Sequence, residues 1–167
     1  LRPSVKQKSH HWSTMADAPD LRLMALDEED LNIISAHLQD AVVKVSDMAP
    51  DGGGRFAMVV NRLAREAGTV RRGFRKVHQR RRAAVHFNRV EAVRSLGIDR
   101  SDPDQVLSLL AIHFEPDLEP GSEPAGEISL VFAGNAMITL QVECIEAQMS
   151  DLGAAWSTPN KPRHPKD

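Results

Sequence analysis

The spacing of hydrophobic positions near the start of the chain predicts a short strand followed by a helix. Residues 21–26, LRLMAL, alternate between apolar and other positions, which is typical of a strand. Leu31, Ile34 and Leu38 then recur at helical spacing, so they lie on one face of a helix. Asp27 stands where it can cap this helix, and the acids that follow it suit the positive end of the helix dipole.

After the helix the hydrophobic period changes from 3.6 to 2, which predicts a run of strands. Gly134 and Asn135 separate two alternating segments and predict a tight hairpin. The glycines of residues 52–54 match neither a P-loop nor a dinucleotide-binding motif, so we expect a simple turn there. The expected strands are residues 41–48, 55–63, 83–93, 105–114, 127–133 and 136–142.

The last periodic segment, residues 143–153, predicts a second helix. Ile145, Met149 and Leu152 would share one of its faces, and Gly153 would end it. The expected fold is therefore α+β: a mostly antiparallel, strongly bent sheet of about six to seven strands, one helix after the first strand and one closing C-terminal helix. This order of elements is similar to that of pleckstrin-homology-like barrels.

Composition limits the domain count and the compartment. A chain of 167 residues is most simply one domain, which we expect to span residues 21–156. Residues 1–20 and 157–167 have no apolar periodicity, and we expect a disordered leader and a disordered tail there. The chain has a single cysteine, which fits a reducing compartment, and no run of ~18 apolar residues that would span a membrane.

The residue types that usually carry catalysis or bind metals are scattered. His78, His86 and His113 stand singly, without the close spacing of metal ligands. Cys144 lies near two glutamates, which do not favour a thiolate, so we expect a small buried hydrophobic side chain rather than a nucleophile. No catalytic motif, metal site or cofactor site is predicted, and enzymatic activity is left open.

One basic segment stands out in a chain whose net charge is −2. No acid occurs between Ala67 and Val90, and the basic residues in this window are typical of contacts with phosphates. The alternative is a solvated or internally paired segment that neutralises acids of the same chain, such as those of residues 115–127. The candidate anion-binding residues are Arg71, Arg72, Arg75, Lys76, Arg80, Arg81 and Arg82.

Several stretches together resemble a known family. These are LMALDEEDLNIISAHLQDAVVKVSDM, RRRAAVHF, VRSLGIDRSDPDQVLSLLAIHFEP and ISLVFAGNAMITLQVECIEAQMSDLG. They resemble an uncharacterised bacterial family of proteins of roughly 150 residues, the size of one domain. The resemblance implies a soluble, cytoplasmic bacterial protein with a domain of unknown function. It supplies no catalytic residue, ligand or partner.

The sequence therefore favours a small, non-enzymatic cytoplasmic binding or adaptor module. Its partner would be an anionic macromolecule or an acidic protein surface that contacts residues Arg71–Arg82. The alternative is an enzyme or small-ligand-binding protein whose pocket leaves no sequence motif. A third class is a structural subunit that associates through an exposed sheet edge, and the oligomeric state is left open.

Overall fold

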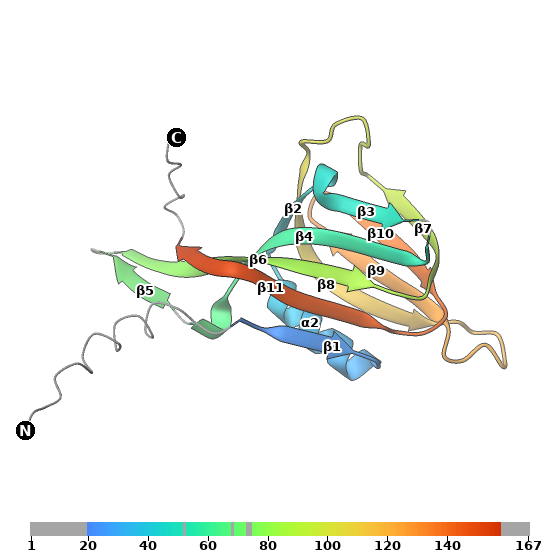
Figure 1. The fold of residues 1–167 in the computed structure, drawn as a ribbon. Coiled ribbons are helices and arrows are strands. Elements are labelled where there is room, and N and C mark those ends of the chain that lie inside the picture. Colours follow the sequence, from blue (N-terminus) through green and yellow to red (C-terminus); the bar gives the residue numbers. More distant parts are fainter. Residues whose placement is uncertain (1–19, 52, 68, 73–74, 158–167) are drawn as a thin grey trace, which may run out of the picture.

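The computed structural model describes residues 20–157 except residues 52, 68 and 73–74 (Figure 1). Most of the predicted leader and tail, residues 1–19 and 158–167, lies outside the described residues, so the domain boundaries stay a prediction. The described residues form one α-helix, two short 3-10 turns and eleven strands. They are β1 (Arg22–Ala25), α2 (Glu28–Leu38), β2 (Val42–Lys44), η1 (Val45–Asp47), β3 (Met48–Asp51), β4 (Arg55–Leu63), η2 (Arg65–Ala67), β5 (Thr69–Arg72), β6 (Arg75–Phe87), β7 (Val90–Leu96), β8 (Val106–Pro116), β9 (Gly126–Phe132), β10 (Ala136–Val142) and β11 (Ala147–Ser157).

The helix α2 forms where the sequence predicts it. The Asp27 carboxylate accepts a hydrogen bond from the Asp30 backbone N–H at 2.9 Å, which satisfies one of the free donors at the start of the helix. The three predicted apolar positions, Leu31, Ile34 and Leu38, are all buried. They pack mainly against β8 and β1, so this amphipathic face holds the helix against the sheet.

The strands form one antiparallel sheet in the order β1-β11-β6-β4-β2-β8-β9-β10-β7, with β3 beside β4 and β5 beside β6. The short strand β2 connects two halves, which lie over one another in Figure 1. Side chains of both halves meet in one hydrophobic core, which includes Val85 and Phe87 from one half and Leu130 and Leu140 from the other. The predictions of a mostly antiparallel sheet and of a helix after the first strand are confirmed.

The two long sides of this folded sheet differ. On one side α2 packs against both β1 and β8 and so covers the space between the halves (Figure 1). On the other side β3 pairs only with β4, and β7 pairs only with β10, among the described strands. No described strand or helix covers this second side.

The predicted closing helix is wrong, because residues Ala147–Ser157 form strand β11, which pairs with β6 on one side and β1 on the other. Ala147, Met149 and Asp151 are buried in alternation, whereas Leu152 is 41% exposed. Asp151 is a charged residue at a buried position, so it interrupts the apolar alternation of the strand. The remaining apolar residues, Ile145, Met149 and Leu152, then have the spacing of a helix. The comparison with pleckstrin-homology-like barrels depended on that helix and loses its basis.

The predicted number of six to seven strands is also wrong. Strands β2, β3 and β5 have three or four residues each, too few for a clear alternation. The turn η1 interrupts the strand expected at residues 41–48, and Arg89, with a φ of 61°, separates β6 from β7. The hairpin at Gly134 and Asn135 is as predicted: both residues have positive φ, and Ala136 pairs with Phe132.

Candidate functional site

Strand β6 contains most of the predicted basic site, and its alternation separates the basic residues into different environments. From Arg80 to Phe87 the strand lies between β4 and β11. The buried positions are Gln79, Arg81, Ala83, Val85 and Phe87, so an arginine occupies a place in the same row as the hydrophobic core residues. Arg81 is 1% exposed. Its charge must therefore be balanced inside the protein.

Arg62 is a second buried arginine and stands directly across from Arg81 in the register of β4 and β6. Two like charges at opposite positions destabilise a sheet unless an acid compensates them. Asp151 of β11 supplies this acid. Arg62 donates from Nε to Asp151 Oδ1 at 2.8 Å and from Nη2 to Oδ2 at 2.9 Å, and Arg81 Nη1 lies 3.8 Å from Oδ2.

Further acids surround these guanidinium groups. Arg62 donates to both carboxylate oxygens of Glu66 on η2, at 3.1 and 2.7 Å. Arg81 Nη1 donates to Asp20 Oδ1 at 2.6 Å. We call Arg62, Glu66, Arg81 and Asp151 the buried arginine cluster. Asp151 also accepts a hydrogen bond from the Leu21 backbone N–H at 2.8 Å, so the cluster links β4, β6, β11 and the chain just before β1.

The pKa values of the cluster follow from these contacts. Burial alone would raise the pKa of Asp151, but hydrogen bonds from Arg62 and Leu21 and the charges of Arg62 and Arg81 hold it below its ordinary value. The pKa of Glu66 is lowered too, because the hydrogen bond and charge of Arg62 outweigh its burial. Burial lowers the pKa of Arg62, and its two acidic partners more than offset this, so the net shift is upward. Arg62, Glu66 and Asp151 are therefore ionised at neutral pH.

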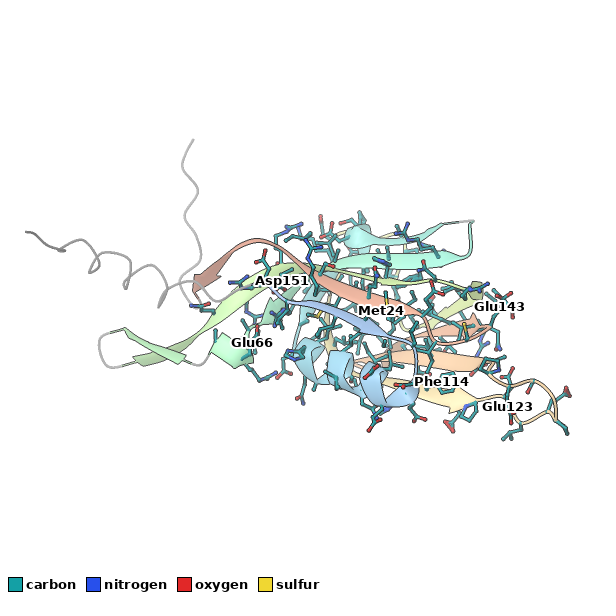
Figure 2. The ribbon with its side chains drawn as sticks, turned by 60° about the horizontal axis from the view of Figure 1, so that its bottom comes forward. Met24, Glu66, Phe114, Glu123, Glu143 and Asp151 are labelled. Carbon is teal, nitrogen blue, oxygen red and sulfur yellow. The ribbon has the colours of Figure 1, made fainter. Side chains whose placement is uncertain are left out.

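This arrangement suits a structural role better than catalysis. Each carboxylate oxygen of Asp151 and of Glu66 already accepts a hydrogen bond from Arg62, so neither acid is poised to bind a substrate. Among the described residues no group of three His, Cys, Asp or Glu side chains is placed to hold a metal ion. Figure 2 shows Asp151 and Glu66 at the end of the sheet from which the β5–β6 hairpin extends.

The neighbours of Arg81 on the same strand are in different positions. Arg82 is exposed. Arg80 is half-buried and donates from Nη1 to the Asn61 carbonyl oxygen at 3.3 Å. Burial lowers the pKa of Arg80, with opposing effects of nearby charges. The three consecutive arginines at the base of the hairpin therefore do not form one continuous charged surface.

The other four predicted residues belong to the far part of the β5–β6 hairpin, which we call the arm (Thr69–Arg72 and Arg75–His78). Here β5 pairs only with β6 among the described strands, and the arm extends beyond the body of the sheet (Figure 1). The register sets Arg71 opposite Lys76 and Arg72 opposite Arg75. Four cationic residues thus occupy two successive cross-strand positions, at the end of β5 and the start of β6.

A family model described as "Protein of unknown function (DUF2948)" matches residues 21–164. The chain belongs to this family. The match confirms the resemblance stated from the sequence. No curated protein and no solved structure matches this DUF2948 chain.

The remaining candidates in this DUF2948 domain lie apart from the cluster. His86 is half-buried and contacts Gln148 at 2.7 Å between Nε2 and Oε1, and His113 is exposed. The prediction for Cys144 is corrected: this thiol is half-buried, because it lies in the turn before β11 rather than inside a packed helix. No helix in the described part of the chain combines the length and apolar character that a membrane span needs.

Sequence reasoning missed the acidic partners of the buried arginines. The acids of residues 115–127 were the expected partners of the basic segment. Glu123 lies at the opposite end of the sheet from Asp151 and Glu66 (Figure 2). One signal for the cluster was available. Arg62 continues the alternating row of Phe56, Met58 and Val60, so it occupies an inward position and requires an acid.

Proposed function

We propose that this DUF2948 protein is a non-enzymatic binding module whose arm binds the phosphate backbone of a nucleic acid duplex. The observation that carries the proposal is the pairing of Arg71 with Lys76 and of Arg72 with Arg75 across the arm. Like charges directly opposite one another destabilise a two-stranded sheet. Phosphates between and beside these residues would remove that repulsion.

The arm contrasts with the base of the same hairpin, where each guanidinium in the buried cluster has acids beside it. The sequence from Ala67 to Val90 contains no acid, so the arm has no carboxylate of its own. A partner that carries closely spaced negative charges is the simplest source of compensation. Nucleic acid provides such charges, about one for each 1.7 Å of duplex.

The shape of the arm favours a duplex over a single strand. A two-stranded β-ribbon fits the major groove of B-form DNA, which is about 12 Å wide. Proteins that bind single strands without sequence preference stack the bases on several aromatic side chains. The arm segment, residues 69–78, contains a single Phe, Tyr or Trp side chain, that of Phe74. We therefore expect binding that tolerates sequence and depends on charge.

The test measures binding to mixed-sequence duplex DNA and RNA over a range of salt concentrations. In the test variant the four basic residues of the arm are changed to serine. Wild type should bind with an affinity that falls steeply with salt, by a slope of about 0.9 for each phosphate contact. The test variant should lose this binding.

A control variant removes the same number of positive charges from other strands. It should bind as well as wild type if the arm is the site, and a parallel loss in both variants would indicate only a general charge effect. Binding to phosphatidylserine vesicles but not to either duplex would overturn the proposal in favour of a lipid surface, and retention only on acidic proteins would overturn it in favour of a protein partner. The control positions are Arg22, Lys44, Arg55 and Arg94, all exposed.

A cytoplasmic location in bacteria belongs to the same proposal. The chain has one cysteine, Cys144, and hence no internal disulfide, which fits a reducing compartment. Fractionation of cells that carry a tagged copy tests it: the protein should appear in the cytoplasmic fraction. Recovery from the periplasm would contradict this part of the proposal.

A further inference from the structure

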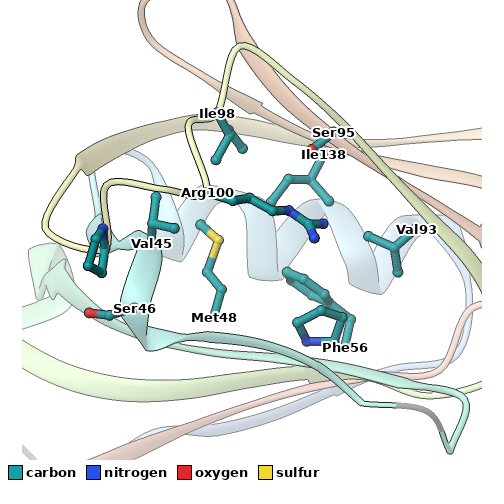
Figure 3. Close-up of a pocket in the computed structure, with 11 residues that line it drawn as sticks. Val45, Ser46, Met48, Phe56, Val93, Ser95, Ile98, Arg100 and Ile138 are labelled. Atoms are coloured by element: carbon teal, nitrogen blue, oxygen red, sulfur yellow. The ribbon is translucent and has the colours of Figure 1, made fainter.

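A cavity of about 260 Å³ lies on the side of the sheet that α2 does not cover. Its walls come from η1, β3 and β4 on one side and from β7, β10 and the loop after β7 on the other. Phe56 and Ile138 at its floor are buried core residues, and Val45, Met48 and Val93 around them are partly buried. The lining is therefore mostly apolar but reaches the surface (Figure 3).

Backbone hydrogen bonds join the two walls of this cavity at both ends. At one end the Val90 N–H donates to the Gly54 carbonyl at 3.0 Å, so the turn between β3 and β4 contacts the start of β7. At the other end the Ser46 N–H donates to the Pro103 carbonyl at 3.0 Å. A continuous groove would accept an extended polypeptide, but a cavity bounded at both ends is suited to a small molecule.

Arg100 adds one positive charge to this apolar cavity. Its side chain extends over the cavity, with the guanidinium directed toward Val93 (Figure 3). Within the described residues this guanidinium makes no ion pair or hydrogen bond, unlike the arginines of the buried cluster. The other polar side chains of the lining are the hydroxyls of Ser46 and Ser95, so no acid balances the charge inside the cavity.

The loop that carries Arg100 is held in place by its own contacts. Gly97 begins it with a φ of 75°, and a Cβ there would come within 2.6 Å of the Asn135 carbonyl oxygen, so glycine is required. The Asp99 carboxylate accepts hydrogen bonds from the Ser101 backbone N–H at 3.0 Å and from its hydroxyl at 2.6 Å. These contacts hold the backbone on both sides of Arg100, whose side chain is exposed.

We propose that this cavity binds a small monocarboxylate with an apolar body, whose carboxylate pairs with Arg100. A guanidinium matches a carboxylate with two parallel hydrogen bonds. One arginine balances one negative charge, whereas a phosphate monoester carries about −1.5 to −2 at neutral pH and would leave charge uncompensated. The volume lies just below the range of about 300–1,000 Å³ typical of ligand pockets, which limits the ligand to a compact molecule. This site is separate from the arm.

The test compares the binding of octanoate and of octan-1-ol by NMR titration, because the two probes share an apolar body and differ in charge. Octanoate should perturb the amide signals of β3, β7 and the loop after β7. Arg100→Gln should weaken octanoate binding by about tenfold or more and leave octan-1-ol binding unchanged, because only the charged partner is lost. Arg94→Gln is the matched control, because Arg94 lies on β7 between the cavity residues Val93 and Ser95 but pairs with Glu127 at 3.2 Å.

A second variant, Ser95→Trp, blocks the cavity from an exposed position on β7, so the core is not altered. It should abolish the binding of both probes while the melting temperature stays that of wild type. The proposal is overturned if octanoate produces no shifts around the cavity, if Arg100→Gln and Arg94→Gln weaken binding equally, or if a folded Ser95→Trp variant binds octanoate as wild type does.

Discussion

The base and the arm of the β5–β6 hairpin contain basic residues of the same kinds, but they lie in opposite environments. At the base, Arg81 occupies a buried position beside Arg62, and Asp151 and Glu66 neutralise the pair. In the arm, cations stand opposite cations and the segment contains no acid. The composition of a basic segment therefore does not determine how its charges are arranged in the fold.

The number of flanking strands accounts for the difference. At the base β6 has β4 on one side and β11 on the other, so every second residue faces the hydrophobic core. A charge at such a position is costly unless it is paired and hydrogen-bonded. In the arm β6 has only β5 beside it among the described strands. The buried arginines of the base stabilise the fold, whereas we propose that the arginines of the arm contact a partner.

The largest expected effect is that of removing the central acid. Asp151→Ala leaves two buried guanidinium groups opposite one another, and we expect a loss of about 3–5 kcal/mol in the free energy of unfolding. Urea denaturation measures it. Glu143→Gln is the control, because Glu143 pairs with Arg89 at the exposed surface at 3.2 Å and should cost no more than about 1 kcal/mol. Equal losses in the two variants would show that the cluster is not essential.

The pH dependence of stability should be the next largest effect. Asp151 and Glu66 have lowered pKa values in the folded state, so they bind protons more weakly there than in the unfolded chain. Their contribution is complete from about one pH unit above the ordinary pKa values of about 4, and it is lost as the pH falls toward their folded values. Melting temperatures between neutral and acidic pH should therefore decline below about pH 5. Asp151→Asn should flatten that decline, and an unchanged profile in this variant would contradict the assignment.

The smallest expected effect on stability is that of the arm. Changing the four basic residues Arg71, Arg72, Arg75 and Lys76 to serine removes like charges from opposite cross-strand positions. The free energy of unfolding should change by no more than about 0.5 kcal/mol. Thermal and urea denaturation of this variant beside wild type provide the measurement. A loss of unfolding free energy as large as that of Asp151→Ala would show that the basic residues of the arm stabilise the fold.

The regular elements of the fold could be predicted because local signals agree with the final structure. Helix α2 has its cap at Asp27 and its apolar face, and the β9–β10 hairpin has its turn at Gly134 and Asn135. Strand β11 could not be predicted in this way, because its buried row contains Asp151 and its partners β1 and β6 are distant in the sequence. A buried acid at this position is stable only because Arg62 and Arg81 lie beside it.

The sequence predicted the basic segment, but it did not predict that the segment divides into a buried base and an arm. The alternation that begins at Phe56 and ends at Arg62 predicts an inward arginine, yet nothing local identifies Asp151 as its partner across 89 residues. No local sequence pattern predicts the cavity below Arg100 either. It forms because two strand edges that are not paired with one another, β3 and β7, meet across the folded sheet.

Hydrogen–deuterium exchange of the wild-type protein, with and without a mixed-sequence duplex, tests the distinction between the base and the arm most directly. We predict slower exchange in Thr69–Arg72 and Arg75–His78 when the duplex is bound, because the ribbon is covered, and unchanged exchange at Arg62, Arg81 and Asp151. Exchange that is unaltered in the arm, or that changes at the buried cluster instead, would contradict the account.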